Sequence, residues 1–245
     1  RFFMETQHRI VDFLGGDYDF WPNPDPYDMG FTVHTTREWD SSTSNVLYYK
    51  TESYPGRITP PRPVPDAWKF KPDEGIAETI NSGTSIVLHR DHGYNNGTGW
   101  ANPSFTTGPV NSLVNGDKLP VVFSLNCATG WFDDKDAFGE AWLRNANGGA
   151  VAFTGAVRVS YSGYNDSLHV GIFDSMWNQY DQNWQSANFA NSWHFGQLMN
   201  YAKDRVLAGY GYNSSKALLT ARLFNVFGDP EMMIRTETPV ALDVS

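Results

Sequence analysis

Two short apolar runs, residues 85–88 and 119–125, constrain the fold of this chain more than any other feature. Each has the length of a buried strand, and each stops where polar residues begin. A third run of this kind, residues 150–156, follows further along the chain. Helical patterns lie between and after the runs, at residues 73–81, 109–115, 167–181, 192–208 and 214–224. Strands that alternate with helices predict an α/β domain with a mostly parallel central sheet between two helical layers.

The composition excludes several classes of partner. The formal net charge of −9 and the pI near 5.0 argue against nucleic acid or an anionic membrane surface. The sequence has no apolar run of about 18 residues, so we expect no membrane span. One cysteine rules out an internal disulfide but leaves the compartment open. The chain opens without the pattern of a signal peptide, on residues that resemble the interior of a helix, which suggests a fragment or a processed piece.

The polar residues that follow the first two runs suggest nucleophilic chemistry. The first run leads to His92 and Gly93, and the second leads to Cys127, the only cysteine of the chain. Loops at the carboxyl ends of parallel strands line the ligand crevice of such sheets, so this histidine and cysteine form a candidate base and nucleophile. The backbone amides of Gly93 and Cys127 are then candidates for an oxyanion hole. A small buried hydrophobic residue is the alternative role for Cys127.

His89 competes with His92 for the role of base, but it falls within the predicted strand. We therefore expect His89 to be a residue of the core or of the other sheet face. The pair His89-x-x-His92 also suggests zinc, although the chain lacks the helical context and a clear third ligand. The acidic residues 133–136 are typical of a solvated loop, with a structural calcium ion as the alternative. We expect no cofactor otherwise.

Five segments, in order over about residues 85–235, resemble the gingipain family of cysteine endopeptidases. The segments that carry the resemblance are Ile86-Val87-Leu88 with Asp91-His92-Gly93 and Trp100, Leu119-Pro120 through Cys127 with the Thr129-Gly130 turn, Phe138-Gly139-Glu140-Ala141, Gly149-Ala150-Val151-Ala152, and Val226-Phe227-Gly228-Asp229-Pro230. The resemblance implies a caspase-like three-layer αβα sandwich. It also implies a protein or peptide substrate and a secreted or cell-surface location.

The resemblance assigns roles to residues of the site. Cys127 is implied as the nucleophile and His92 as the general base and acid, with the Gly93 and Cys127 amides as the oxyanion hole. The family orients its histidine with an acidic residue from an earlier strand. Here Glu38, which follows a predicted strand at residues 31–36, is the best positional match, and Asp40 is the second. A carboxylate in this role holds the ring and stabilises its charged form.

The S1 pocket, which receives the substrate residue before the scissile bond, is the point where this chain departs from the family pattern. Arg90 and Asp91 replace the small residues that precede the family's histidine, so its preference for basic substrates does not carry over. Arg90, Asp91, Trp100 and Asp166 are the candidate S1 residues. Asp166 would favour a basic substrate side chain and an inward-facing Arg90 an acidic one. An Arg90–Asp91 pair exposed to solvent is the alternative.

The resemblance also sets the expected domain limits. Residues 1–237 form the peptidase domain without its N-terminal portion, and residues 238–245 form a linker or the start of an immunoglobulin-like domain. The missing portion implies either an N-terminal companion chain from the same precursor or numbering from a processing site. Two other functions stay open, a sortase-like transpeptidase of a bacterial secretion system and a catalytically silent binding module.

Overall fold

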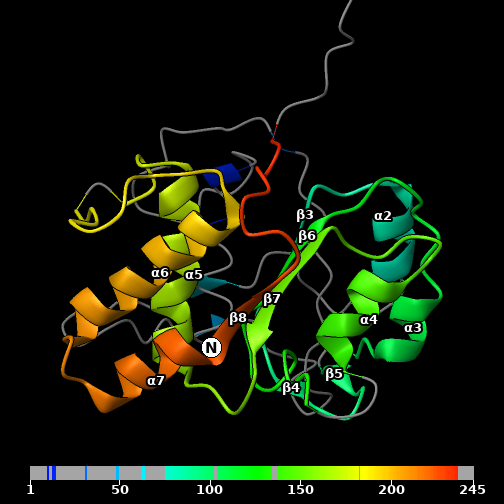
Figure 1. Ribbon diagram of the computed structural model, residues 1–245, viewed down its shortest axis with the longest axis horizontal. Coiled ribbons are helices and arrows are strands. Elements are labelled where there is room, and N and C mark those ends of the chain that lie inside the picture. The colour runs from blue at the N-terminus through cyan, green and yellow to red at the C-terminus, as the bar shows by residue number, and fades with distance from the viewer. Residues whose placement is uncertain are drawn as a thin grey trace, which may run out of the picture.

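The computed structural model describes nearly all of residues 75–236 and a few isolated positions before them (Figure 1). The described parts are Ile10, Phe13, Leu14, Phe31, the backbones of the two-residue strands β1 (Tyr48–Tyr49) and β2 (Arg62–Pro63), and residues 75–101, 104–133, 137–181 and 183–236. None of the helices in these parts combines the length and apolar character that a membrane crossing requires.

A four-stranded sheet forms the centre of the described structure. Its strands are β3 (Ile86–His89), β6 (Val121–Ser124), β7 (Ala152–Ala156) and β8 (Phe224–Phe227), in the spatial order β3-β6-β7-β8. The first three run parallel to one another, and β8 pairs antiparallel with β7. The predicted mostly parallel sheet is therefore confirmed.

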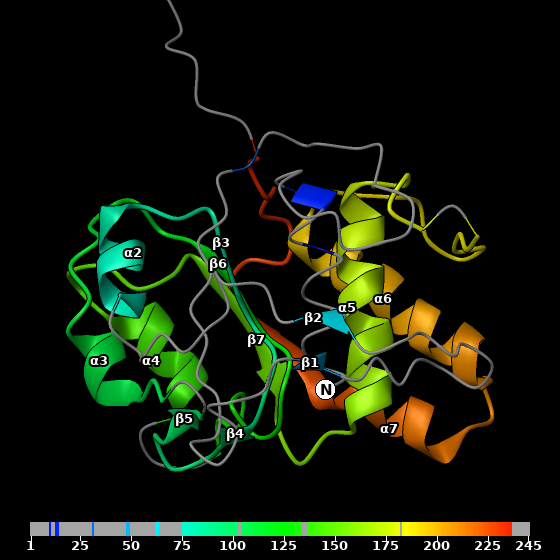
Figure 2. The ribbon, with the colours of Figure 1, turned by 180° about the vertical axis from the view of Figure 1, so that it is seen from behind.

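Helices cover both faces of the sheet, as Figures 1 and 2 show from opposite sides. On one face lie α2 (Ile76–Ser82), α3 (Thr107–Asn111) and α4 (Phe138–Arg144). On the other lie α5 (Ser162–Met176), α6 (Phe195–Tyr210) and α7 (Ser215–Leu223). The expected three-layer αβα sandwich is confirmed.

The alternation of side chains along β6 produces two separate cores. Val121 and Phe123 belong to the core under α5, α6 and α7, whereas Val122 belongs to the core under α2, α3 and α4. Successive side chains of a strand point to opposite faces, so a strand that is apolar at every position must be covered on both sides. All four residues of β6 are buried.

Three strands, the two of a hairpin and β8, were not predicted from the sequence. A hairpin of β4 (Gly93–Tyr94) and β5 (Gly99–Trp100) occupies part of the segment expected to be a loop. β8 occupies residues between the predicted 214–224 helix and the predicted turn at 227–230. Two-residue strands are too short to produce an alternating pattern, and the apolar residues of β8 follow directly on those of α7. β8 also depends on pairing with β7, which lies far away in the sequence.

Several predictions fall partly or wholly outside the described residues. Ile10, Phe13 and Leu14 are helical and buried, but the rest of the predicted 1–14 helix lies outside. The same is true of the predicted strand at 31–36 beyond Phe31, and of residues 238–245. The domain limits therefore stay a prediction.

Candidate active site

The carboxyl ends of β3 and β6 bring the two candidate catalytic segments together. The Leu125 N–H donates to the His89 carbonyl oxygen at 2.9 Å, so the strands stay paired up to their last residues. Beyond them, Gly93 lies directly against the turn that carries Cys127. A Cβ atom on Gly93 would lie 2.5 Å from Asn126 Oδ1 and 2.6 Å from the Cys127 carbonyl oxygen. Only glycine permits this approach without a rearrangement.

The turn after Cys127 is sharp and fixed to the neighbouring strand. Ala128 has a φ of 58°, a conformation that alanine seldom adopts. Its N–H donates to the Arg158 carbonyl oxygen at 3.0 Å, and the Gly130 N–H donates to the Ala156 carbonyl oxygen at 3.0 Å. These bonds to the end of β7 hold the strained turn and so fix the direction of the Cys127 side chain.

Asn126 anchors the same turn from inside. Its Oδ1 accepts bonds from the hydroxyls of Thr129 at 2.8 Å and Ser124 at 3.2 Å. Its Nδ2 then serves as donor to Nδ1 of His89 at 2.6 Å. Burial, with a smaller contribution from the nearby Arg90 charge, lowers the pKa of His89 to about 3. His89 is therefore a neutral core residue, and the sequence-based choice against it as the base agrees with its surroundings.

Trp100 belongs to this core as well, although the sequence placed it among the candidate S1 residues. Its ring stacks on His89 with 4.5 Å between centroids, and its Nε1 donates to the Ser124 hydroxyl at 2.7 Å. The residue is 2% exposed. In this position the Trp100 ring supports the floor of the site and offers no surface to a substrate.

The two amides expected in the oxyanion hole are available as donors. Gly93 pairs with Trp100 across the hairpin, and the Ala101 N–H donates to the His92 carbonyl oxygen at 3.1 Å. In this register Gly93 and Trp100 are a non-hydrogen-bonded pair, so the Gly93 N–H points away from β5. Among the backbone bonds of the described residues, none uses the Cys127 N–H. Two free amides on touching segments can bind one oxygen.

The sulfur of Cys127 is half-buried and contacts a residue that the sequence did not single out. The backbone N–H of Ser160 donates to Sγ at 3.3 Å, and the Ser160 hydroxyl lies 3.7 Å from Sγ. As a thiol, Cys127 donates to the Ser160 carbonyl oxygen at 3.5 Å. Ser160 lies in the loop between β7 and α5, the third of the parallel strand ends. Its position after a predicted strand was the only signal in the sequence.

His92 extends from the same edge of the sheet, with 61% of its side chain exposed. The Asp91 carboxylate lies beside it, because Asp91 Oδ1 accepts from the His92 backbone N–H at 2.6 Å and is 3.8 Å from His92 Nε2. Burial raises the pKa of Asp91. Among the described residues, Asp91 is thus a carboxylate beside the ring. Glu38 and Asp40, the sequence-based candidates for that role, lie outside the described residues.

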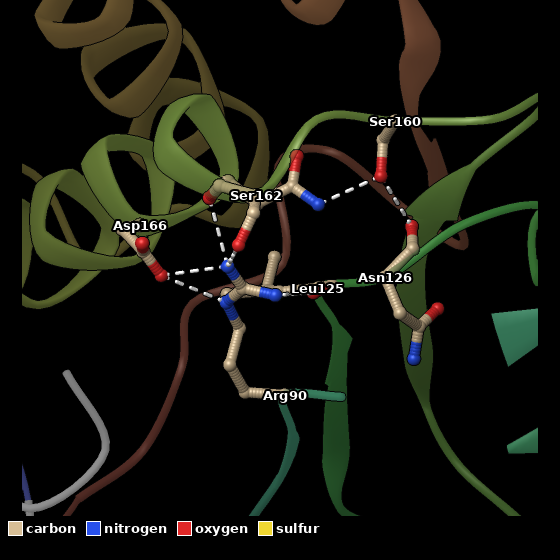
Figure 3. Close-up of polar contacts among 7 residues, drawn as sticks. Arg90, Leu125, Asn126, Ser160, Ser162 and Asp166 are labelled. Atoms are coloured by element: carbon tan, nitrogen blue, oxygen red, sulfur yellow. Dashed lines mark hydrogen bonds and ion pairs between the residues drawn. The ribbon is translucent and has the colours of Figure 1, made fainter. Parts of the chain in front are cut away.

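Arg90 and Asp166, two of the candidate S1 residues, lie in one buried ion pair (Figure 3). The Arg90 Nη2 and Nε donate to Asp166 Oδ1 at 2.6 Å and 3.0 Å. The same guanidinium donates to the carbonyl oxygens of Ser162 at 2.8 Å and Leu125 at 3.2 Å. The Arg90 side chain is 1% exposed, so the alternative of a solvent-exposed Arg90–Asp91 pair is wrong. The pair clamps the start of α5 to the end of β6 and leaves neither charge facing solvent.

The described residues contain no group of three histidine, cysteine or acidic side chains that could hold a metal ion. His89 is buried in the core while His92 is exposed, so the pair does not converge on one point. Of the acidic segment 133–136 only Asp133 is described, and its two carboxylate oxygens accept from Arg158 at 3.0 Å and 2.7 Å.

Comparison with known proteins places the chain in a family. A profile of Peptidase family C25 matches residues 11–235. Gingipain R2 of Porphyromonas gingivalis is 29% identical over 175 residues, which are 70% of this chain and 22% of that protein. Lys-gingipain of the same species is 34% identical over 101 residues, which are 41% of this chain and 6% of that protein.

Solved structures show the same fold. The crystal structure of the Arg-specific cysteine proteinase gingipain R aligns with a TM-score of 0.60 and 23% identity, over 69% of this chain and 38% of that one. A complex of the pro- and mature domains of P. gingivalis RgpB aligns with a TM-score of 0.58 and 22% identity, over 69% and 38%. The chain thus spans about a fifth of gingipain R2 and less than half of either solved chain.

Proposed function

The chain belongs to Peptidase family C25, and on that premise we propose that it is a cysteine endopeptidase with Cys127 as its nucleophile. The proposal rests on the arrangement of groups around Cys127. The Cys127 sulfur, held by Ser160 at 3.3 Å, lies on a turn in contact with Gly93, and the Gly93 and Cys127 amides are free to bind an oxygen. A nucleophile and an oxyanion site on one turn are the parts that acyl transfer requires.

The proposed reaction proceeds in two halves. His92 takes the thiol proton, and the Cys127 sulfur attacks the scissile carbonyl carbon. The Gly93 and Cys127 amides donate to the oxygen that gains negative charge, a contribution typically worth about 2.7–4 kcal/mol per donor. His92 then returns the proton to the leaving amine. In the second half a water molecule, deprotonated by His92, attacks the thioester carbon. The carbon–sulfur bond breaks, the acid product leaves, and His92 returns its proton to the Cys127 sulfur.

The chemistry of each step uses groups of the chain itself, and we propose no cofactor. The substrate is a protein or peptide, because the nucleophile and the oxyanion amides are those of amide hydrolysis. The expected orienting role of Glu38 stays part of the proposal, with Asp91 as a second carboxylate beside His92. A structural calcium ion stays an alternative from the sequence and has no step in the reaction.

We also propose an N-terminal companion domain and a secreted or surface location. The solved complex of RgpB pro- and mature domains is the support for the companion, since this chain aligns with 38% of the chain in that structure. The gingipain relatives support the location. Co-purification of a full-length precursor, followed by mass spectrometry of the chains that stay together, tests the companion.

Peptide cleavage by matched variants tests the function. Cys127→Ala and His92→Ala are expected to abolish cleavage of a mixed peptide library and to keep the far-ultraviolet circular dichroism of the wild type. His194→Ala removes a histidine remote from the site, whose Nδ1 bonds the Glu231 carbonyl oxygen at 2.8 Å, and should keep full activity. Cleavage by Cys127→Ala at the wild-type rate would refute the proposal.

The mass of the products separates the proposed hydrolysis from its alternatives. Hydrolysis adds one water to each cleaved peptide and yields a free acid. In the presence of an added amine, a sortase-like transpeptidase yields an amide-linked adduct instead. A wild-type chain that yields neither product is a silent binding module.

A further inference from the structure

We propose that the Ser160 hydroxyl is a switchable hydrogen-bond donor that stabilises the Cys127 thiolate, and that Asn165 is the positioning residue that aims it. The inference deepens the proposed function, because it concerns the same nucleophile. The four groups involved come from the ends of β6 and β7 and from the first turn of α5.

The Ser160 hydroxyl has three hydrogen-bond partners within reach, and they leave it few alternatives. Asn165 Nδ2 donates to Ser160 Oγ at 2.7 Å, which fills an acceptor position of the oxygen. The single hydroxyl proton then has two acceptors within reach, the Asn126 carbonyl oxygen at 3.0 Å and the Cys127 sulfur at 3.7 Å. A hydroxyl has one proton to donate, so it can donate to only one of these two acceptors at a time.

The charge on the Cys127 sulfur determines which acceptor receives the Ser160 hydroxyl proton. While Cys127 is a thiol, its own proton points to the Ser160 carbonyl oxygen at 3.5 Å, and the hydroxyl does better with the Asn126 carbonyl. Once the proton leaves, sulfur becomes an anionic acceptor, and hydrogen bonds to ionised groups are about twice as strong as neutral ones. The hydroxyl then rotates to sulfur and joins the Ser160 N–H, which already lies at 3.3 Å.

The surrounding structure restricts the hydroxyl to these two partners. Ser160 is 8% exposed and Asn165 is 2% exposed, so water competes little for either. The Arg90 guanidinium donates to the carbonyl oxygen of Ser162, two residues after Ser160, at 2.8 Å. In Figure 3 a dashed line joins the Ser160 hydroxyl to the Asn126 carbonyl oxygen, and the Arg90–Asp166 pair lies at the start of α5. The loop that carries Ser160 is therefore fixed at two points, the Ser160 hydroxyl and the Ser162 carbonyl oxygen.

The pH dependence of thiol alkylation tests the proposal without any substrate. Iodoacetamide reacts with the thiolate, so the rate of Cys127 alkylation against pH, followed by intact mass, reports the thiolate fraction. Ser160→Ala should lower the rate at pH 6 by about fivefold, the effect of one ordinary hydrogen bond, and should leave the rate at high pH unchanged. The midpoint of the profile thus moves up by roughly half a pH unit or more.

Three further variants separate this role from a structural one. Ser160→Thr keeps the hydroxyl and should keep the wild-type midpoint. Asn165→Ala frees the hydroxyl to rotate and should move the midpoint in the same direction as Ser160→Ala, by a smaller amount. Ser175→Ala removes another buried hydroxyl, one that bonds the Ser192 carbonyl oxygen at 3.3 Å, and should leave the midpoint unchanged.

An unchanged midpoint in Ser160→Ala overturns the proposal, as does an unchanged midpoint in Asn165→Ala should the first variant fail to fold. An equal shift in Ser175→Ala also overturns it, because the shift would then follow from a loosened structure. The alkylation profiles and peptide cleavage can also disagree. If the alkylation rates depend on pH as expected but the wild-type chain cleaves no peptide, the proposed function fails and the hydrogen-bond switch stands.

Discussion

The Arg90–Asp166 pair gives the most direct quantitative prediction, because both residues were candidates for substrate binding and the structure buries them together. Arg90→Met removes two bonds to Asp166 and one bond to each of the carbonyl oxygens of Leu125 and Ser162. The Arg90 and Asp166 side chains are 1% and 10% exposed. Removing one partner of a buried ion pair typically costs about 3–5 kcal/mol, because the other charge keeps its desolvation penalty. We expect Arg90→Met to lower the free energy of unfolding by an amount in that range.

Urea unfolding at pH 7, followed by tryptophan fluorescence, measures this loss as a change in the free energy of unfolding. Arg144→Met is the matched control. Its Nη2 lies 3.8 Å from Glu140 Oε2 in a pair whose side chains are 63% and 37% exposed, so it should lose less than about 0.5 kcal/mol. The double variant Arg90→Met with Asp166→Leu removes both charges and should recover part of the stability lost in Arg90→Met alone.

The opposite pattern would refute the structural role. If Arg90 or Asp166 contacts substrate, Arg90→Met should leave the free energy of unfolding within about 0.5 kcal/mol of the wild type, as surface substitutions do. It should instead change which substrate residue is preferred before the scissile bond. A peptide library cleaved by wild type and variant distinguishes the two patterns.

Three further predictions address other parts of the account. Gly93→Ala should lower kcat/KM by about 100-fold or more by displacing an oxyanion donor, whereas Gly108→Ala, where a Cβ meets nothing closer than 3.7 Å, should keep wild-type kinetics. Burial raises the pKa of Asp174 to about 6, so the folded state retains a proton that the unfolded chain releases near its ordinary value of 3.8. The stability of the wild type should therefore fall as pH rises from about 4 to about 6, by about 1–3 kcal/mol, and thermal unfolding of Asp174→Asn should lack that fall. Trp100→Phe should cost about 1–2 kcal/mol in urea unfolding through the lost bond to Ser124 and leave the order of preferred peptides unchanged, whereas a changed order would restore Trp100 to the substrate pocket.

The part of the fold that was predictable from the sequence is the part with strong local patterns. The runs that became β3, β6 and β7 are apolar and end in polar residues, and alternation with helices indicated the parallel order. Both Cys127 and Gly93 were identified because they stand at the ends of such runs. The structure places them in contact, as strand ends at one edge of a sheet predict.

The part that was missed depends on contacts between distant residues. Arg90 and Asp166 are 76 positions apart, and nothing in either local segment indicates that one neutralises the other. Ser160 and Cys127 are 33 positions apart, and only the pairing of β6 with β7 brings them together. Residue type and local pattern can place a side chain at a strand end. They cannot show whether it faces a substrate or a buried partner.

Trp100 shows the same limit for an aromatic residue. A tryptophan soon after a candidate catalytic histidine suits a substrate pocket, and the family resemblance supports that hypothesis. The stacking on His89 and the bond to Ser124 arise from the hairpin of β4 and β5, which has too few residues to be predicted. Local sequence therefore identified the neighbourhood of the site but not the direction of this side chain.

Covalent labelling shows directly whether Cys127 is the nucleophile. The wild-type chain is treated at neutral pH with peptidyl acyloxymethyl ketones that carry arginine, lysine, aspartate or alanine next to the reactive group, and the modified residue is located by peptide mass spectrometry. We expect modification of Cys127 by at least one of the four probes, loss of the label in Cys127→Ala, and much slower labelling in His92→Ala. A wild-type chain that reacts with iodoacetamide at Cys127 but with none of the four ketones, or that is labelled at another residue, would contradict the role of Cys127 as the nucleophile.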